Sequence, residues 1–491
     1  MITEVHFQVG HLQAGAANGR VIVVTRTSEA VSEIQLSAKA DGYRFNGALS
    51  AQSTTSGVAR ALASLGIAVF HAELPGPIPP GELELAASWP GSEVFTQKLH
   101  PIASALPDAG LAFVLGSCLY GNETFVETLA SALERAIGPA SGRGDWSIAN
   151  PKFALFLGDN VYLDVHPDRV GGDASRHTAA IYAKAFALSA ASARVMGALP
   201  VLSTFDDHEF YDGYPETEPH VMRTWLPHVR ASFVAAAHDG IALFQQAKNP
   251  TPVASEGCSF RFDIAPLSFF ALDTRTTRTR LRIEQPELCR EAEIAAFETW
   301  AQGLTAPGIF VISQPLFSPK GSYIEPSFSE FQGHYERILK ALRDAPFDIA
   351  VLSGDLHTSR VLTLDIGGRL VTEVTSSPLV RVPSFAKNLL HRVFGGPEDQ
   401  EREKIEIPIT VAQPPTSLSI GCHEYLMGST APNSFALVRV RQQSADTIAV
   451  DVELVDHAAN RLALCERDHG GRKPRIREGM PCQLSFSLSR R

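Results

Sequence analysis

Cysteine is scarce in this sequence, and its spacing argues against a disulfide framework. Only six cysteines occur among the 491 residues, and they are scattered without paired spacing. A reduced compartment therefore fits the sequence better than an oxidising one. The N-terminus, residues 1–7, also lacks the basic and apolar segments of a secretory leader and the twin arginines of an export signal. We therefore expect a cytoplasmic protein, with export as the alternative if a leader has been removed.

Positive charge is also in short supply. The formal net charge is −10, which disfavours a nucleic-acid backbone or an anionic membrane surface as the main partner. A local site for an anion is compatible with this charge, because bound cations do not enter the count. No apolar run is long enough to cross a bilayer. We expect neither a nucleic-acid-binding module nor a transmembrane segment, and the sequence leaves the oligomeric state open.

The composition is that of a globular protein with more than one domain. Hydrophobic residues make up 44% of the chain and charged residues 20%, and 491 residues exceed one ordinary core. Residues 1–105 carry short strand patterns and predict an immunoglobulin-like β-sandwich as an accessory domain. Residues 106–491 alternate strand and helix patterns, which predicts an α/β domain with largely parallel strands. Within this domain we expect helices over 122–137, 174–199, 221–237, 291–304 and 331–342, and a proline-containing surface excursion over 380–432.

Four short apolar runs in this α/β region end in side chains that can bind a metal. Because ligands of open α/β sheets bind at the carboxyl ends of the strands, we expect these four ends to meet. Charged ligands gather where a cation cancels their repulsion, so the recurrence predicts a site for two metal ions. The side chains are Cys118 after the first run, Asp159 and Tyr162 after the second, Asp206, Asp207, His208 and Glu209 after the third, and Asp355 and His357 after the fourth.

Other catalytic motifs do not fit these residues. A nucleophile elbow requires glycine where Leu115 stands, and a cysteine-phosphatase loop would require arginine at Thr124. Two His-Glu pairs resemble the start of a zincin motif, but Asp212 and Met427 occupy the positions of the second histidine. Taken singly, each site residue has an ordinary alternative, such as a buried thiol for Cys118. The metal site is therefore inferred from the four strand ends jointly.

The ordered motifs resemble the PhoD-like, or alkaline phosphatase D, family of metallophosphoesterases. The resemblance covers roughly residues 110–380, and the N-terminal sandwich fits the accessory domain of that family. It implies a calcineurin-like core with four layers in the order α/β/β/α. The matching motifs are residues 116–118, 158–162, 206–209, 272–275, 313–315, 353–357 and 373–378.

The resemblance also implies a dinuclear centre of Fe³⁺ and Ca²⁺, with other divalent metals as alternatives. Asp159 would bridge the two ions, and Asp212 lies near an additional ligand position of relatives. The implied ligands are Cys118, Asp159, Tyr162 and His357 around the ferric ion, and Asp159, Asp207 and Asp355 at the second site.

The activity implied by this family is hydrolysis of phosphate mono- or diesters. Two cations lower the pKa of a bound water and neutralise the phosphoryl oxygens. His208 could donate a proton to the leaving oxygen. Arg275 could clamp the phosphate, or it could form a surface salt bridge instead. The sequence leaves two other classes open: a metal-stabilised binding protein without turnover, and an enzyme that acts on a non-phosphate substrate.

Overall fold

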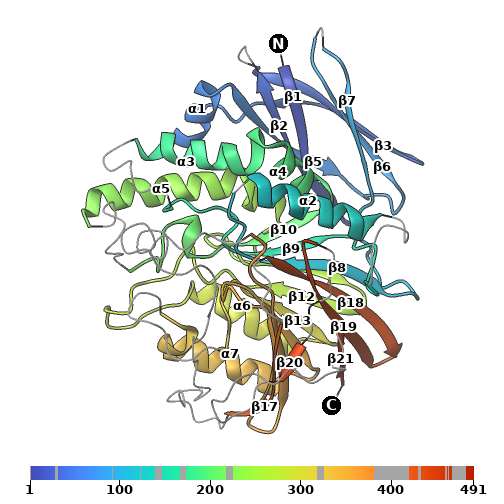
Figure 1. Ribbon diagram of the computed structural model, residues 1–491, viewed down its shortest axis with the longest axis vertical. Helices are drawn as coiled ribbons and strands as arrows, with labels where there is room; N and C mark the ends of the chain where they lie inside the picture. The colour runs from blue at the N-terminus through green and yellow to red at the C-terminus, as the bar shows by residue number, and fades with distance from the viewer. Residues whose placement is uncertain are drawn as a thin grey trace, which may run out of the picture.

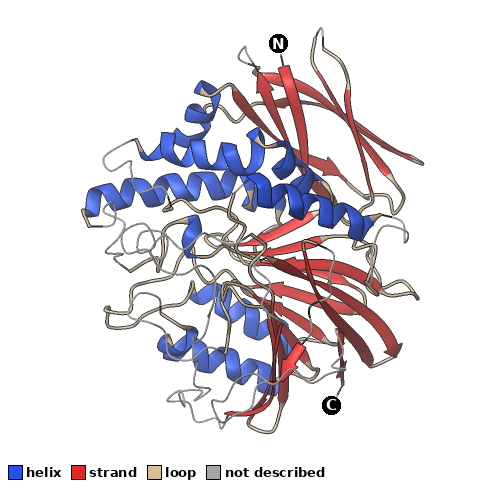
Figure 2. Cartoon of the chain, viewed as in Figure 1, coloured by secondary structure: helices blue, strands red, loops and turns tan. Residues whose placement is uncertain are grey.

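Two large β-sheets face each other in the computed structural model, and helices cover the outer side of each sheet (Figures 1 and 2). A smaller β-rich part formed by the first hundred residues packs against one of these helical layers (Figure 1). The structure describes residues 2–27, 31–90, 92–121, 123–138, 146–165, 173–216, 225–317, 326–380, 420–428, 433–458, 462, 464–466 and 483–490.

The first large sheet has six strands in the order β10-β9-β8-β18-β19-β21. Its first three strands pair in parallel, and the other three are antiparallel. The parallel strands are buried on both faces, which explains their continuous apolar runs. The strands are β8 (Leu111–Gly116), β9 (Ala154–Leu157), β10 (Val201–Thr204), β18 (Ser434–Ser444), β19 (Thr447–Asp456) and β21 (Gln483–Ser489).

The second large sheet has eight strands in the order β11-β12-β13-β14-β16-β15-β17-β20. Strands β12, β13, β14 and β16 are parallel, and antiparallel strands flank them on both sides. The strands are β11 (Phe260–Ile264), β12 (Leu267–Ala271), β13 (Gly308–Val311), β14 (Ile349–Ser353), β15 (Arg360–Ile366), β16 (Leu370–Thr375), β17 (Ile420–Gly428) and β20 (Leu464–Glu466).

Alternation along each strand divides the side chains between two apolar interfaces. On β8, Phe113 belongs to the cluster between the sheets, whereas Val114 faces the helices. On β13, Ile309 faces the first sheet and Phe310 packs against the other helical layer. Helices α2–α5 cover the first sheet and α6 and α7 cover the second (Figure 1). They are α2 (Glu123–Ile137), α3 (Ala174–Ala183), α4 (Ala190–Gly197), α5 (Pro227–Phe244), α6 (Glu291–Gln302) and α7 (Gln332–Asp344).

Two helix predictions are wrong in their extent. The helix expected over 221–237 is α5, which begins at Pro227, because proline fits the first helical turn but not a helix interior. Its expected start lies in residues 217–224, outside the described residues. The helix expected over 174–199 is divided by a π-helical turn at Lys184–Leu188, after which Ser189 caps α4.

The N-terminal part is a sandwich of two sheets, as expected, but it also contains a helix. One sheet has the order β1-β2-β5 and the other β4-β3-β6-β7, and their facing side chains form one apolar cluster. Sequence analysis missed helix α1, whose N-cap Ser56 accepts a hydrogen bond from the Ala59 amide. The elements are β1 (Ile2–Val9), β2 (Asn18–Thr27), β3 (Glu33–Ala40), β4 (Tyr43–Ser50), α1 (Gly57–Ser64), β5 (Ile67–Pro75), β6 (Leu83–Ser88) and β7 (Phe95–Leu99).

The surface excursion expected over 380–432 is only partly described. Residues 381–419 and 429–432 lie outside the described residues. The prediction is wrong for Ile420–Gly428, because this segment forms β17 and pairs along most of β15. None of the helices in the described ranges combines the length and apolarity needed to span a membrane.

A buried lysine lies where the N-terminal sandwich meets the core. Lys248 ends a 3₁₀ turn after α5, and its carbonyl accepts a hydrogen bond from the His11 amide at 2.6 Å. The side chain is 0% exposed, and its Nζ lies 5.3 Å from the centre of the Phe186 ring. Nζ has no hydrogen-bond partner among the described residues. Burial lowers the pKa of Lys248 to about 7, so this junction contains an amine that is costly to protonate.

We predict that Lys248→Met stabilises the protein by about 1–3 kcal/mol at neutral pH, because the variant no longer buries an unpartnered amine. In the wild type the unfolded chain binds the lysine proton more tightly than the folded chain. Its stability should therefore rise with pH between the folded pKa of about 7 and the ordinary value of 10.5. The variant should lose that rise. Unfolding midpoints measured across this pH range test the prediction, with the variant of an exposed lysine, Lys39→Met, as control. Equal midpoints and equal pH dependence for the two variants would contradict it.

Candidate metal centre

The predicted ligand residues follow the carboxyl ends of four strands and have an unusual backbone. Cys118, Asp159, Asp355 and His357 all have positive φ angles, at 59°, 54°, 67° and 52°. Within the described ranges, Asn150 is the one further non-glycine residue with a positive φ. This left-handed conformation is unfavourable for residues other than glycine and is retained where the surroundings enforce it. Backbone strain therefore concentrates at the strand ends that carry the predicted ligands.

Two glycines allow these strand ends to approach one another closely. Gly158 has a φ of 81°, and a Cβ atom added to it would lie 2.6 Å from the Cβ of Asp206. A Cβ added to Gly354 would lie 2.6 Å from the Cβ of Ser117, although Gly354 and Ser117 belong to different sheets. Glycine before each acidic residue is therefore needed for space, and at Gly158 also for backbone conformation.

The buried carboxylate of Glu209 ties the ends of β9 and β10 together. It accepts hydrogen bonds from the backbone amides of Asp159 at 2.8 Å, Asn160 at 2.7 Å and Asp206 at 2.8 Å. The side-chain amide of Gln245 donates a further bond at 3.0 Å. Sequence analysis gave Glu209 no individual role, although its place beside three other polar residues after a buried strand was a signal. It fixes the loops that present the ligands.

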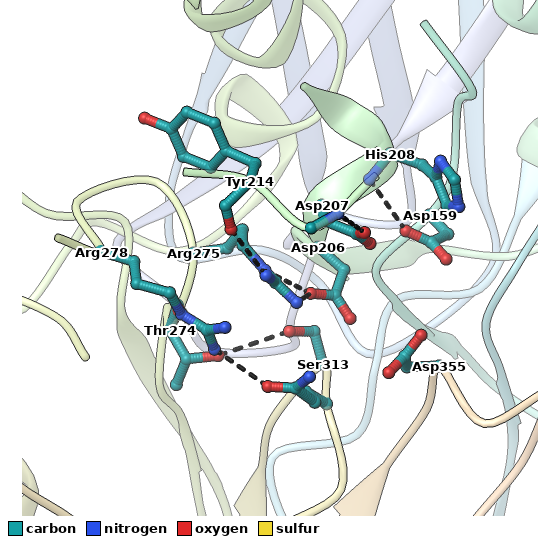
Figure 3. A network of polar contacts seen from close by, with 12 residues as sticks. Asp159, Asp206, Asp207, His208, Tyr214, Thr274, Arg275, Arg278, Ser313 and Asp355 are labelled. Atoms are coloured by element: carbon teal, nitrogen blue, oxygen red, sulfur yellow. Dashed lines mark hydrogen bonds and ion pairs between the residues drawn. The ribbon is translucent and has the colours of Figure 1, made fainter. Parts of the chain in front are cut away.

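All the predicted ligands except Tyr162 fall into three overlapping groups, which also include Asp206 and His208. In each group the potential ligand atoms lie within 4.8 Å of one another, and each group could hold a metal ion. Asp159 belongs to two groups and Asp207 to two, so cations held by these groups would share carboxylates and be neighbours. Figure 3 shows Asp159, Asp207 and Asp355 around a common space. The groups are Cys118, Asp159 and His357; Asp159, Asp207 and His208; and Asp206, Asp207 and Asp355.

The donor set fits metal ions on physical grounds. Burial raises the pKa of Asp159 well above its usual value, and the carboxylates of Asp207 and Asp206 add to the rise. Asp206 Oδ2 and Asp207 Oδ1 are buried without a hydrogen-bond partner among the described residues. Unpartnered carboxylate oxygens are costly in an apolar interior, so both atoms are suited to a cation.

Cys118 and Tyr162 lie on the same side of Asp159. The Cys118 thiol is 3.4 Å from Asp159 Oδ2, and the Tyr162 hydroxyl donates to the same oxygen at 3.4 Å. The Ser377 hydroxyl donates to the Cys118 sulfur at 3.1 Å. Burial, followed by the charges of neighbouring groups, raises the pKa of both Cys118 and Tyr162 well above their usual values. A nearby cation would favour the thiolate and phenolate forms, which are the metal-binding forms.

His208 is held by an acidic partner that sequence analysis missed. Both carboxylate oxygens of Asp164 lie 2.9 Å from His208 Nδ1. The His208 ring packs against Tyr162, with 4.3 Å between ring centres. Burial disfavours the imidazolium ion, but Asp164, Asp207 and Asp159 outweigh this and raise the pKa of His208 well above its usual value. The backbone amide of Asp212 donates to Asp164 Oδ2 at 2.9 Å and so helps to hold the carboxylate that pairs with His208.

Arg275 is 0% exposed, so the alternative of a surface salt bridge is wrong. Its Nε donates to Asp206 Oδ1 at 2.5 Å, and its Nη2 is paired with the same oxygen. Its Nη1 donates to the Tyr214 carbonyl at 2.8 Å (Figure 3). Burial raises the pKa of Asp206 to about 6, and the charge of Arg275 opposes that rise. The guanidinium is therefore engaged by protein groups.

The comparisons with known proteins support the fold. No protein-family model and no curated protein matches this chain. A solved structure of PhoD is similar with a TM-score of 0.56 and 14% sequence identity, over 94% of this chain and 91% of PhoD. A β-glucuronidase structure from Parabacteroides merdae has 10% identity over 94% of this chain and 69% of its own, but its TM-score of 0.25 carries no structural argument. The chain thus has a mixed α/β, PhoD-like fold with an N-terminal β-rich region.

We predict that Glu209→Gln lowers the stability of the protein by about 1–3 kcal/mol. The NH₂ group of glutamine would replace one carboxylate oxygen, and an NH₂ group donates hydrogen bonds and does not accept them. At least one of the backbone amides that now donate to Glu209 would therefore lose its acceptor. Chemical unfolding would measure this loss. Exposed Glu127, which pairs with Arg194 at the surface, provides the control Glu127→Gln, for which we expect a change within about 0.5 kcal/mol. Equal unfolding midpoints for the two variants would show that the hydrogen bonds accepted by Glu209 do not contribute to stability.

Proposed function

We propose that this chain is a metal-dependent phosphoesterase that hydrolyses phosphate mono- or diesters. The observation that supports this proposal most directly is the overlap of the three ligand groups at Asp159 and Asp207. Shared carboxylates bring two cation positions next to each other, which is the arrangement suited to phosphoryl transfer. The PhoD-like fold supports the same class of enzyme and a calcineurin-like core. We further propose residues 1–105 as an accessory domain and 106–491 as the catalytic domain.

The ligand chemistry supports different cations at the two positions. Thiolate, phenolate, imidazole and carboxylate donors of Cys118, Tyr162, His357 and Asp159 suit Fe³⁺ at the first position. The oxygen donors of Asp207 and Asp355, with Asp159 as the shared ligand, suit Ca²⁺ at the second position. When bound, such ions supply a nucleophile at neutral pH and neutralise the phosphoryl oxygens.

His208 is proposed as the proton donor to the leaving oxygen. Its backbone amide donates to Asp159 Oδ1 at 3.3 Å, which fixes the residue beside the shared carboxylate. Asp164 orients the ring through Nδ1 and favours the imidazolium, so the other nitrogen, Nε2, carries a proton that can be transferred. A binding protein without turnover would gain nothing from this oriented acid. Arg275 would have to leave Asp206 to reach a substrate, so we do not assign it to phosphate binding.

Asp159→Ala tests the proposed function. Removing the shared carboxylate should lower the content of both metals and abolish hydrolysis of an aryl phosphate and of the corresponding diester. Metal analysis of the purified protein and both assays, with and without added calcium and iron, measure these effects. The control variant Asp263→Ala changes an exposed carboxylate of β11 and should leave the metal content and the hydrolysis rates unchanged. Unchanged metal content and hydrolysis in the Asp159 variant would overturn the proposal.

His208→Ala should reduce turnover by about 100-fold or more if His208 acts as a general acid. The metal content should change little. The loss should be smaller for nitrophenyl esters than for alkyl esters, because nitrophenolate leaves without needing a proton. Steady-state rates on a series of leaving groups measure this dependence. An equal loss across the series would rule out proton donation by His208.

A further inference from the structure

Asp206 lies between a buried arginine and the carboxylate of Asp355. It is 0% exposed, and only its Oδ1 is paired with Arg275. Its Oδ2 has no hydrogen-bond partner among the described residues. The potential ligand atoms of Asp206, Asp207 and Asp355 lie within 4.8 Å of one another. Figure 3 shows Arg275 on one side of Asp206 and Asp355 on the other.

Arg275 is itself fixed in place, so it can orient Asp206. Its Nη1 bonds to the Tyr214 carbonyl at 2.8 Å, and its backbone amide donates to Asp273 Oδ1 at 3.0 Å. Two guanidinium nitrogens pair with one oxygen of Asp206, which restricts rotation of the carboxylate. With Oδ1 held in this way, Oδ2 is the oxygen left for another positive group.

We propose that Asp206 is a ligand of the second cation position, with Arg275 as the positioning residue that orients it. It would join Asp207, Asp355 and the shared Asp159, which brings the carboxylates for an oxygen-preferring divalent cation such as Ca²⁺ to four. Calcium takes six to eight oxygen ligands, so a further carboxylate is consistent with its requirements. This inference rests on the proposed function, because it adds a ligand to the same centre.

A purely structural ion pair explains less of the geometry. If Asp206 served only to neutralise Arg275, its second oxygen would be buried without compensation, which costs about 1–3 kcal/mol or more for a charged group. The buried pair of Arg360 and Glu373 shows the contrast. There one Glu373 oxygen lies 3.0 Å from Arg360 Nη2, and the other accepts a hydrogen bond from the Leu316 amide at 2.7 Å. Both oxygens of Glu373 are satisfied within the protein.

The test is a calcium titration of the full chain after metal removal, followed by calorimetry. Asp206→Asn alone removes a ligand but also leaves the Arg275 charge uncompensated near the cation. The double variant Asp206→Asn/Arg275→Met removes both charges of the pair, so it keeps the net charge of the wild type. We expect both variants to bind Ca²⁺ at least about 10-fold more weakly, because a charged ligand is lost in each. Glu373→Gln is the matched control and should bind Ca²⁺ as the wild type does.

A second readout reports on the first cation position. Co²⁺ bound by the Cys118 thiolate should give a charge-transfer band in the near ultraviolet, and the Asp206 variants should keep that band. Calcium binding by the double variant at wild-type affinity would show that Asp206 only balances Arg275, whether or not the protein hydrolyses phosphate esters. Wild-type protein that binds no calcium would overturn this inference together with the calcium assignment. Weakened calcium binding in a protein without hydrolysis would support Asp206 as a ligand and reject the phosphoesterase.

Discussion

The arrangement of the candidate metal centre depends on the hydrogen bonds accepted by Glu209. Strands β9 and β10 are adjacent and parallel, with Leu157 paired to Thr204, so their loops leave the sheet side by side. Loops at the ends of parallel strands can diverge as soon as the ladder ends. A single buried carboxylate prevents this by accepting amides from both loops, and charge strengthens those bonds. The carboxylates of Asp159 and Asp207 are consequently neighbours although their residues are far apart in sequence.

The resulting crowding of negative charge explains why positive groups are distributed around the centre. Several carboxylates are buried within a few ångströms of one another, and the protein supplies only part of the compensation. Arg275 offsets the charge of Asp206, and the carboxylates of Asp164 and Asp207 favour the charged form of His208. Bound cations would compensate the rest of the negative charge. The buried carboxylates, which destabilise the protein on their own, are therefore suited to bind metal ions.

The sequence predicts the strand ends but not the contacts behind them. An apolar run followed by polar residues that can bind a metal is a local signal, and it correctly identified the ends of β8, β9, β10 and β14. Pairing of His208 with Asp164 brings together residues separated by two helices and a strand, and no periodicity in the sequence predicts that contact. The burial of Arg275 depends on long-range contacts, such as its bond to the Tyr214 carbonyl, and on the turn after β12. The start of α5 could have been predicted, because Pro227 is a local signal that tertiary packing did not override.

Hydroxyl groups join the two sheets at the centre, in addition to the ion pair between Arg275 and Asp206. Ser117, which follows β8, donates to the Ser376 carbonyl at 3.0 Å and accepts the Asp355 amide at 3.0 Å. Ser377 accepts the His357 amide at 3.0 Å and donates to the Cys118 sulfur. A hydroxyl can donate and accept at once without adding charge, so these serines hold the sheets together without competing with the carboxylates for a cation. Cys118 follows a strand of the first sheet and His357 follows a strand of the second, so the proposed first cation position depends on contacts that hold the two sheets together.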